Sequence, residues 1–191
     1  DDPEIYAQIY DANGNPVGSN ILINTTQLGA QVKPKVVGID NGNFVISWVS
    51  ADQDGDGWGI YSQTFDSSGI PVGTETLINT TTTGDQFEHN SISLDNGGYA
   101  MAWAEEVDNG GGSFTISIKM QQYTSAGVPD GVETTIKTEA AGFNAILNSA
   151  DPTYADVEMT ELSDGNIVIA WSRTDYPNSQ TTQIQILDTN G

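Results

Sequence analysis

The strongest constraint on the fold of this 191-residue chain is an internal repeat. One repeated segment reads IYAQIYDANGNPVG, IYSQTFDSSGIPVG and, more loosely, IKMQQYTSAGVPDG, at residues 5–18, 60–73 and 118–131. A second reads DNGNFVISW, DNGGYAMAW and SDGNIVIAW, at residues 40–48, 95–103 and 163–171. We therefore expect a single domain of three repeats and a final partial strand, at about 5–59, 60–117, 118–183 and 184–191.

Each repeat carries the signals of short antiparallel strands. Asn-Gly or Asp-Gly before an alternating segment predicts a hairpin with a type I′ turn, in which both central residues have φ > 0. In the strand that follows, Phe44, Ile46 and Trp48 share one face, and the smaller Val45 and Ser47 lie on the other. The other two copies alternate in the same way, which predicts close packing on both faces.

The repeat length predicts the fold class and leaves the architecture open. About four short strands per repeat, with no sustained helical periodicity, predict an antiparallel all-β fold. Three arrangements suit this pattern: propeller-like blades, a pseudo-threefold trefoil-like barrel, and a β-sandwich. The blade length favours the propeller-like blades, as does the order of a hairpin, a strand ending in Trp, and a strand with Gln8, Gln63, Gln121 or Gln185 at the matching position.

The charge restricts the classes of partner. Twenty-six acidic residues against five basic ones give a formal net charge of −21. Such a surface repels nucleic acid and anionic membranes, and it attracts metal cations. The chain has no cysteine and no apolar segment long enough to cross a membrane. It opens on DDPEIYAQ rather than on a signal peptide, as a mature or excised domain would, and we expect it to be extracellular.

One loop has the spacing of a calcium site. Asp52, Asp54 and Asp56 alternate and are followed by Gly57, which matches the D-x-D-x-D-G core of a calcium-binding loop. Calcium prefers six to eight oxygen ligands, and the backbone carbonyl of Trp58 is a further candidate. The sequence therefore predicts Ca²⁺ here, bound by a loop between strands.

A helical EF-hand is excluded, because its twelfth position is Gln63 rather than Glu and a strand follows the loop. The corresponding loop of the second repeat keeps Glu105, Glu106, Asp108 and Asn109 without the alternation. We expect a second calcium ion at Glu105, Asp108 and Asn109. The alternative for either loop is a solvated acidic turn.

The third repeat contains an insertion. The spacing between equivalent Trp residues is 55 from Trp48 to Trp103 but 68 from Trp103 to Trp171. Because loops on a β scaffold often carry binding sites, we expect a ligand pocket within 137–158. The alternative is a tolerated surface loop. The candidate ligand-binding residues are Phe143, Asn144, Asn148, Asp151, Tyr154 and Asp156.

The sequence offers little for catalysis. His89 is the only histidine and Arg173 the only arginine, and neither lies in a nucleophile or zinc motif. Glu105 and Glu106 are adjacent on an expected strand, so they point to opposite faces and do not form a glycosidase pair. We expect a protein that is not an enzyme.

The combined repeat D-N-G-x-F-V-x-S-W … D-G-x-G-I-Y-x-Q-x-F-D-x-x-G-x-P-V-G, at 40–73, resembles repeats of very large secreted calcium-dependent proteins of Gram-negative bacteria, including the RTX adhesins. The resemblance is strongest over 1–110. It implies a ligand-binding module, of which one kind captures the C-terminal carboxylate of a partner protein on bound Ca²⁺. It would make Asp52, Asp54 and Asp56 calcium ligands.

Charge, repeats and resemblance together predict a calcium-dependent, non-catalytic binding module of a large secreted bacterial adhesin. Its expected partner is a peptide or glycan on another cell surface, with no nucleic acid and no membrane insertion. We expect a monomeric unit within a larger multidomain chain at the bacterial cell surface. The alternative is a structural spacer of an adhesin stalk that calcium makes rigid.

Overall fold

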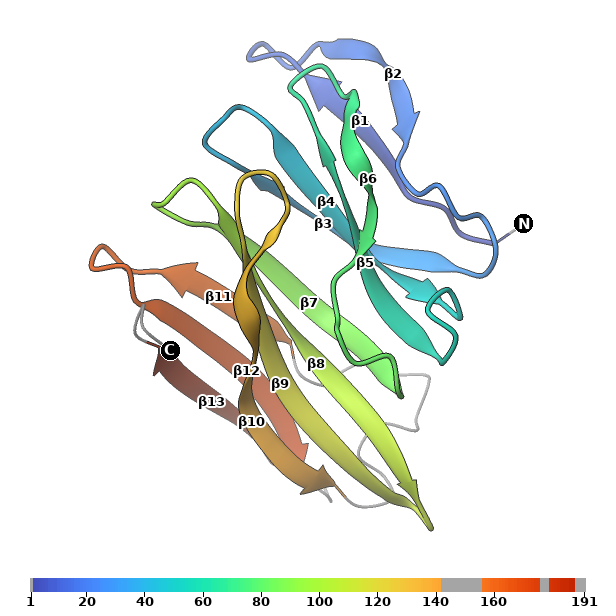
Figure 1. Ribbon diagram of the computed structural model, residues 1–191, viewed down its shortest axis with the longest axis vertical. Coiled ribbons are helices and arrows are strands. Elements are labelled where there is room, and N and C mark those ends of the chain that lie inside the picture. The colour runs from blue at the N-terminus through green and yellow to red at the C-terminus, as the bar shows by residue number, and fades with distance from the viewer. Residues whose placement is uncertain (1, 142–155, 176–178, 188–191) are drawn as a thin grey trace.

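The computed structural model describes residues 2–141, 156–175 and 179–187, and every regular element there is a β-strand (Figure 1). The described residues contain no helix that is long and apolar enough to cross a membrane. The all-β prediction is confirmed. The strands are β1 (Tyr6–Tyr10), β2 (Pro16–Leu22), β3 (Gln31–Gly38), β4 (Phe44–Ala51), β5 (Trp58–Phe65), β6 (Pro71–Leu77), β7 (Asp85–Ser93), β8 (Tyr99–Gly110), β9 (Ser113–Tyr123), β10 (Pro129–Ala141), β11 (Val157–Glu161), β12 (Ile167–Asp175) and β13 (Ser179–Leu187).

The strands form four antiparallel sheets in which each strand pairs with its neighbour in sequence. We call β1–β2 the N-terminal hairpin, β3–β6 the first sheet, β7–β10 the second sheet and β11–β13 the third sheet. None of the described sheets closes into a barrel. The second sheet lies between the first and third sheets (Figure 1). Its edge strand β7 contacts β3 and β5 of the first sheet on one side and β11 of the third sheet on the other.

The Trp strands β4, β8 and β12 organise the core. In β8, the large face with Met101 and Trp103 packs on the first sheet, and the small face with Ala102 and Ala104 packs on the third sheet. Trp48 of β4 packs in the same sense toward the N-terminal hairpin, and Trp171 of β12 toward the second sheet. The predicted large and small faces are therefore confirmed, and the seam on each side of the second sheet joins a small face to a large one.

The hairpins before the Trp strands are confirmed, but their turn type is not I′. Only the glycines have positive φ, at 82° for Gly42, 85° for Gly97 and 84° for Gly165. The Gly42 amide bonds Ile39 O and the Ile39 amide bonds Asn43 O, so the turn is type I with a glycine bulge. The prediction was wrong because Asn-Gly also fits this longer loop, where only glycine needs φ > 0.

The glutamine repeated at Gln8, Gln63 and Gln121 lies next to an irregularity in the strand pairing of its hairpin. The register of β5 against β6 shifts between Ser62 and Thr64, and Gln63 donates from Nε2 to Thr64 O and Val72 O across that shift. Gln8 and Gln121 donate in the same way to the backbone of their own hairpins. These side chains are structural hydrogen-bonders within their hairpins.

Equivalent polar contacts join neighbouring sheets. The amide and hydroxyl of Thr25 both donate to Glu75 Oε2, at 2.7 and 2.8 Å. The amide and hydroxyl of Thr80 donate to Glu133 Oε2 in the same way, both at 2.8 Å. We call these contacts the Thr–Glu clasps. They show that successive sheets meet through one repeated geometry.

Candidate functional site

The acidic loop 52–57 connects β4 to β5. The Asp52 amide donates to Gly57 O at 2.6 Å, and Asp52, Gly55 and Gly57 all have positive φ. Asp52 and Asp56 are exposed, whereas Asp54 is half-buried. The structure therefore places the three predicted calcium ligands together in one tight loop between strands.

The second sheet closes this loop from the other side. Asp85, the first residue of β7, accepts a hydrogen bond from the Trp58 amide at 3.0 Å, and the Gly84 amide donates to Asp56 Oδ2 at 3.1 Å. A Cβ at Gly57 would lie 2.2 Å from Asp85 Oδ1. Only glycine fits there, so the loop and the start of β7 are packed directly against each other.

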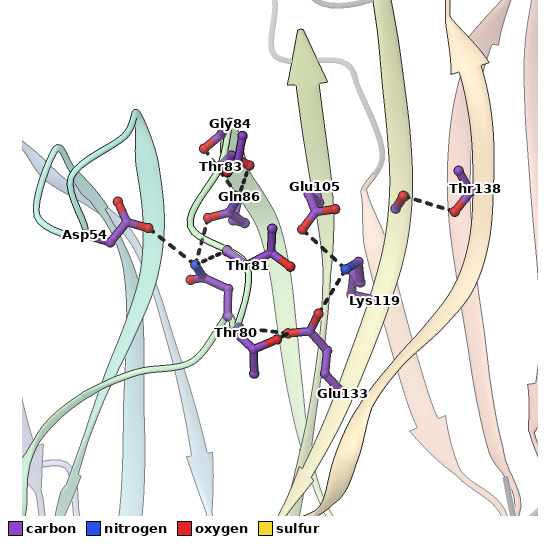
Figure 2. A network of polar contacts seen from close by, with 12 residues as sticks. Asp54, Thr80, Thr81, Thr83, Gly84, Gln86, Glu105, Lys119, Glu133 and Thr138 are labelled. Atoms are coloured by element: carbon purple, nitrogen blue, oxygen red, sulfur yellow. Dashed lines mark hydrogen bonds and ion pairs between the residues drawn. The ribbon is translucent and has the colours of Figure 1, made fainter. Parts of the chain in front are cut away.

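Asp54 points toward the β6–β7 connection, as Figure 2 shows. Its Oδ2 lies 3.4 Å from Asn79 Nδ2, and Asn79 also donates to Gln86 Oε1 at 2.8 Å. A Cβ at Gly59 would come within 2.7 Å of Asp54 Oδ2. The orientation of this carboxylate is therefore set by neighbours on both sheets.

Burial and neighbouring acidic charges raise the pKa of Asp85 at this seam. Burial raises the pKa of Asp85; the Trp58 hydrogen bond opposes that change, and the charges of the three loop aspartates add to it. No ion pair in the described part of the chain includes the loop aspartates or Asp85. The negative charge here lacks a basic partner among the described side chains.

Glu106, on the second sheet, adds a further carboxyl group to those of the loop aspartates and Asp85. We call these side chains together the acidic group. Glu106 stands opposite Asp85 in the β7–β8 register, is 5% exposed, and its Oε2 is buried with no hydrogen-bond partner. Burial raises the pKa of Glu106 to about 7, and the charges of Asp85 and Asp108 contribute. This carboxyl group is held in a place that disfavours its ionised form.

The structure does not bring together the three residues expected to hold a second ion. Glu105 lies on the other face of β8, with Oε2 at 3.4 Å from Lys119 Nζ. Lys119 Nζ lies closer to Glu133 Oε1, at 2.9 Å, and Glu133 also accepts a hydrogen bond from the Thr80 amide (Figure 2).

Asp108 and Asn109 belong to the hairpin between β8 and β9. Asp108 Oδ1 accepts from the Gly110 amide at 2.7 Å, and Asn109 Nδ2 donates to Thr115 Oγ1 at 2.9 Å. Asp108 thus shares a face with Glu106, and Glu105 does not. The alternation along β8 is the reason, and it also separates Glu105 from Glu106 as expected.

The predicted ligand pocket lies mostly outside the described residues. Asp156 is described, and it is exposed just before β11. The five others, which lie outside, are Phe143, Asn144, Asn148, Asp151 and Tyr154.

The acidic group offers oxygen ligands of the kind that Ca²⁺ prefers. Carboxylates come from the loop aspartates and Asp85, and Gly84 O lies 3.3 Å from where a Cβ of Gly57 would stand. Among the described residues, no three acidic or histidine side chains already form a metal cage. An ion binding here would have to draw neighbouring carboxylates together by side-chain rotation.

Asp85, which belongs to no spaced motif, was missed by the sequence reasoning, and Glu106 was considered in the second acidic loop without being linked to Asp85. They lie 21 positions apart and become neighbours only through strand pairing. A position-by-position comparison of the repeats could have singled out these two acids, because they replace non-acidic residues of the first repeat.

Comparisons with known proteins bear on the fold alone. Neither protein-family models nor curated proteins match the chain. Among solved structures, it is similar to an unknown-function protein from Dyadobacter fermentans DSM 18053, with a TM-score of 0.56 and 15% identity. The match covers 84% of this chain and 52% of that one, so the chain spans about half of that protein's length.

Two enzymes are matched less closely. An endo-arabinase from Bacteroides thetaiotaomicron VPI-5482 matches with a TM-score of 0.47 and 15% identity, over 94% of this chain and 63% of its own. An alpha-L-arabinofuranosidase from Podospora anserina matches with a TM-score of 0.30 and 10% identity, over 87% and 67%. These scores are too low to support any statement about activity.

Proposed function

We propose that this chain is a calcium-dependent, non-catalytic binding module of a large secreted bacterial adhesin. Its partner would be a peptide or a glycan on another cell surface. In this proposal the sheets are propeller-like blades, and the chain works outside the cell as one monomeric part of a larger protein.

The observation that carries the proposal is the closure of the acidic loop by Asp85. Three loop aspartates meet a fourth carboxylate from the next sheet, with hydrogen bonds in both directions across the seam. No ion pair among the described residues neutralises this group. A hard divalent cation would supply the missing positive charge and find the oxygen ligands that it prefers.

The charge balance supports a bridging role for the cation. With five basic residues in 191, the chain has few side chains that can hold an anionic group. A bound calcium ion with an open coordination position could hold a peptide carboxylate or sugar hydroxyls directly. The resemblance of residues 40–73 to adhesin repeats agrees with this role.

The alternative is a spacer that calcium makes rigid. The Thr–Glu clasps favour it, because the same two hydrogen bonds recur at successive seams. A repeated seam suits a stalk, in which every unit meets the next in the same way. In this alternative calcium would stabilise the chain without any partner being bound.

Thermal unfolding with saturating calcium and with EDTA tests the calcium dependence. We expect calcium to raise the free energy of unfolding by about 2–3 kcal/mol if its concentration is about 100 times Kd. D54N/D56N should lose most of this gain. D130N is the matched control, because exposed Asp130 lies near the start of β10, at the end of the second sheet away from the acidic loop.

Peptide and glycan arrays screened with calcium and with EDTA separate the two functions. Array binding that EDTA abolishes supports the binding module. A calcium-dependent gain in stability without array binding favours the spacer. Equal stability in calcium and in EDTA contradicts both.

A further inference from the structure

Asp85 and Glu106 form an unfavourable pair for the fold on its own. They face each other directly across β7 and β8, and Asp108 lies two residues further along the same face. Like charges in directly opposite positions of an antiparallel sheet destabilise it. None of the ion pairs in the described part of the chain offsets this repulsion.

Glu106 is also buried, and one of its carboxyl oxygens lacks a partner. It is 5% exposed, and its Oε2 makes no hydrogen bond. A buried carboxylate oxygen without a hydrogen bond or a cation is strongly unfavourable. The neighbouring charges are those of Asp85 and Asp108, so this oxygen lies within the acidic group rather than beside a base.

The first sheet provides an internal comparison. The corresponding positions there are Ala30 and Ala51, which are also paired, since the Ala51 amide donates to Ala30 O at 3.0 Å. The glycine near this pair is equivalent too: a Cβ at Gly29 would clash with Ala51 O, as one at Gly84 would with Glu106 O. The same backbone is thus built with two alanines, so the fold does not require acids there.

The first sheet brings further oxygen atoms close to the pair of Asp85 and Glu106. Asp85 Oδ1 accepts from the Trp58 amide, and Asp56 reaches the Gly84 amide, so the acidic loop and the pair share one seam. Among the described residues, Asp85 Oδ2 is not part of an ion pair. Oxygen atoms from both sheets therefore surround the start of β7.

We propose that Asp85 and Glu106 form a calcium site at the seam between the first and second sheets, with Asp56 as the ligand from the acidic loop. The ion would join the two sheets, and rotation of the Glu106 side chain would complete the site. This inference rests on the proposed calcium dependence, but it requires no particular peptide or glycan.

Calcium titration calorimetry on the whole chain tests the site. D85A/E106A gives the second sheet the two alanines of the first, so it is expected to fold. We expect a loss of at least tenfold in calcium affinity, or of one bound ion, relative to the wild type. D130N should bind calcium as the wild type does, because it removes one acid at the far end of the sheet.

Thermal unfolding gives an independent readout. In EDTA, D85A/E106A should melt above the wild type, because the like-charge pair is gone. In saturating calcium the order should reverse. E106Q keeps the size of the side chain and removes one charge, so it should show the same reversal even if the double variant folds poorly.

The outcomes separate this inference from the proposed function. If the wild type binds calcium and both variants bind it with unchanged affinity and stoichiometry, the site is wrong and the proposed function stands. If the wild type binds no calcium, both are wrong. If the variants lose calcium and no partner is found on the arrays, the site stands and the module is a spacer.

Discussion

Gly84 shows how closely single residues control the seam at the acidic loop. Its φ is +77°, and a Cβ there would lie 2.1 Å from the backbone oxygen of Glu106. Gly14 has nearly the same φ, +81°, but an added Cβ would meet nothing within 4 Å. Substitution of Gly14 would therefore introduce backbone strain alone, whereas substitution of Gly84 would introduce backbone strain and a steric clash.

We predict that G84A destabilises the chain much more than G14A does. G14A should lower the free energy of unfolding by about 1 kcal/mol, because an L-residue is strained at this φ. G84A should lower it by roughly 3 kcal/mol or more, because backbone atoms of two strands must also move apart. Urea unfolding of both variants measures the difference, and equal losses would contradict the described packing.

At this scale the sequence predicted part of the candidate site. Asp52, Asp54 and Asp56 have a spacing that a tight loop requires, so their proximity could be read directly from the sequence. The pairing of Asp85 with Glu106 could not be found in this way, since strand register decides which residues face each other. Glu105 was grouped with Asp108 because they are close in sequence, although strand alternation places them on opposite faces.

At the scale of the element, the Trp strands are the best predicted part of the fold. Alternation of large and small residues in β8 required two packed faces, and both faces are covered. The turn type was not predictable from Asn-Gly alone, because a type I turn with a bulge places its glycine in the same left-handed region. The boundaries of the sheets also differ from those of the sequence repeats: the first sheet spans 31–77 and so takes strands from two repeats.

We predict that the small face of β8 is far less tolerant of added volume than the same face of β12. Ala102 is fully buried against the third sheet, whereas the equivalent Ala170 is half-buried. A102L should lower the free energy of unfolding by about 2 kcal/mol or more through overpacking, and A170L by less than about 1. Thermal or urea unfolding of both variants tests this, and similar effects would contradict the packing order of the sheets.

At the scale of the whole molecule, acidification has two opposing effects on stability. With a net charge of −21, protonation of carboxylates relieves repulsion as the pH falls. His89 in β7 opposes this, since burial lowers its pKa from 6.5 to about 4 and the charges of Lys35 and Lys33 add to the effect. Between these values the unfolded chain binds a proton that the folded chain does not.

We therefore predict that His89 removes stability as the pH falls from about 6.5 toward 4. The contribution is present above pH 6.5, and its loss should reach roughly 3 kcal/mol. H89L should show a smaller loss than the wild type over this range, because it has no group to protonate in the core. Urea unfolding in EDTA at several pH values measures the two profiles, and parallel profiles would contradict the assignment.

The joining of small faces to large faces gives the molecule a direction. Each sheet has one side that receives the next sheet and another that fits the one before, so two sheets cannot exchange places or stack back to back. Removal or duplication of a whole unit of about 55 residues would nevertheless recreate the same seam on either side of the change. Recombination between repeats could thus lengthen or shorten such a protein without new packing solutions, while a unique residue pair such as Asp85 and Glu106 would mark one unit as different from the rest.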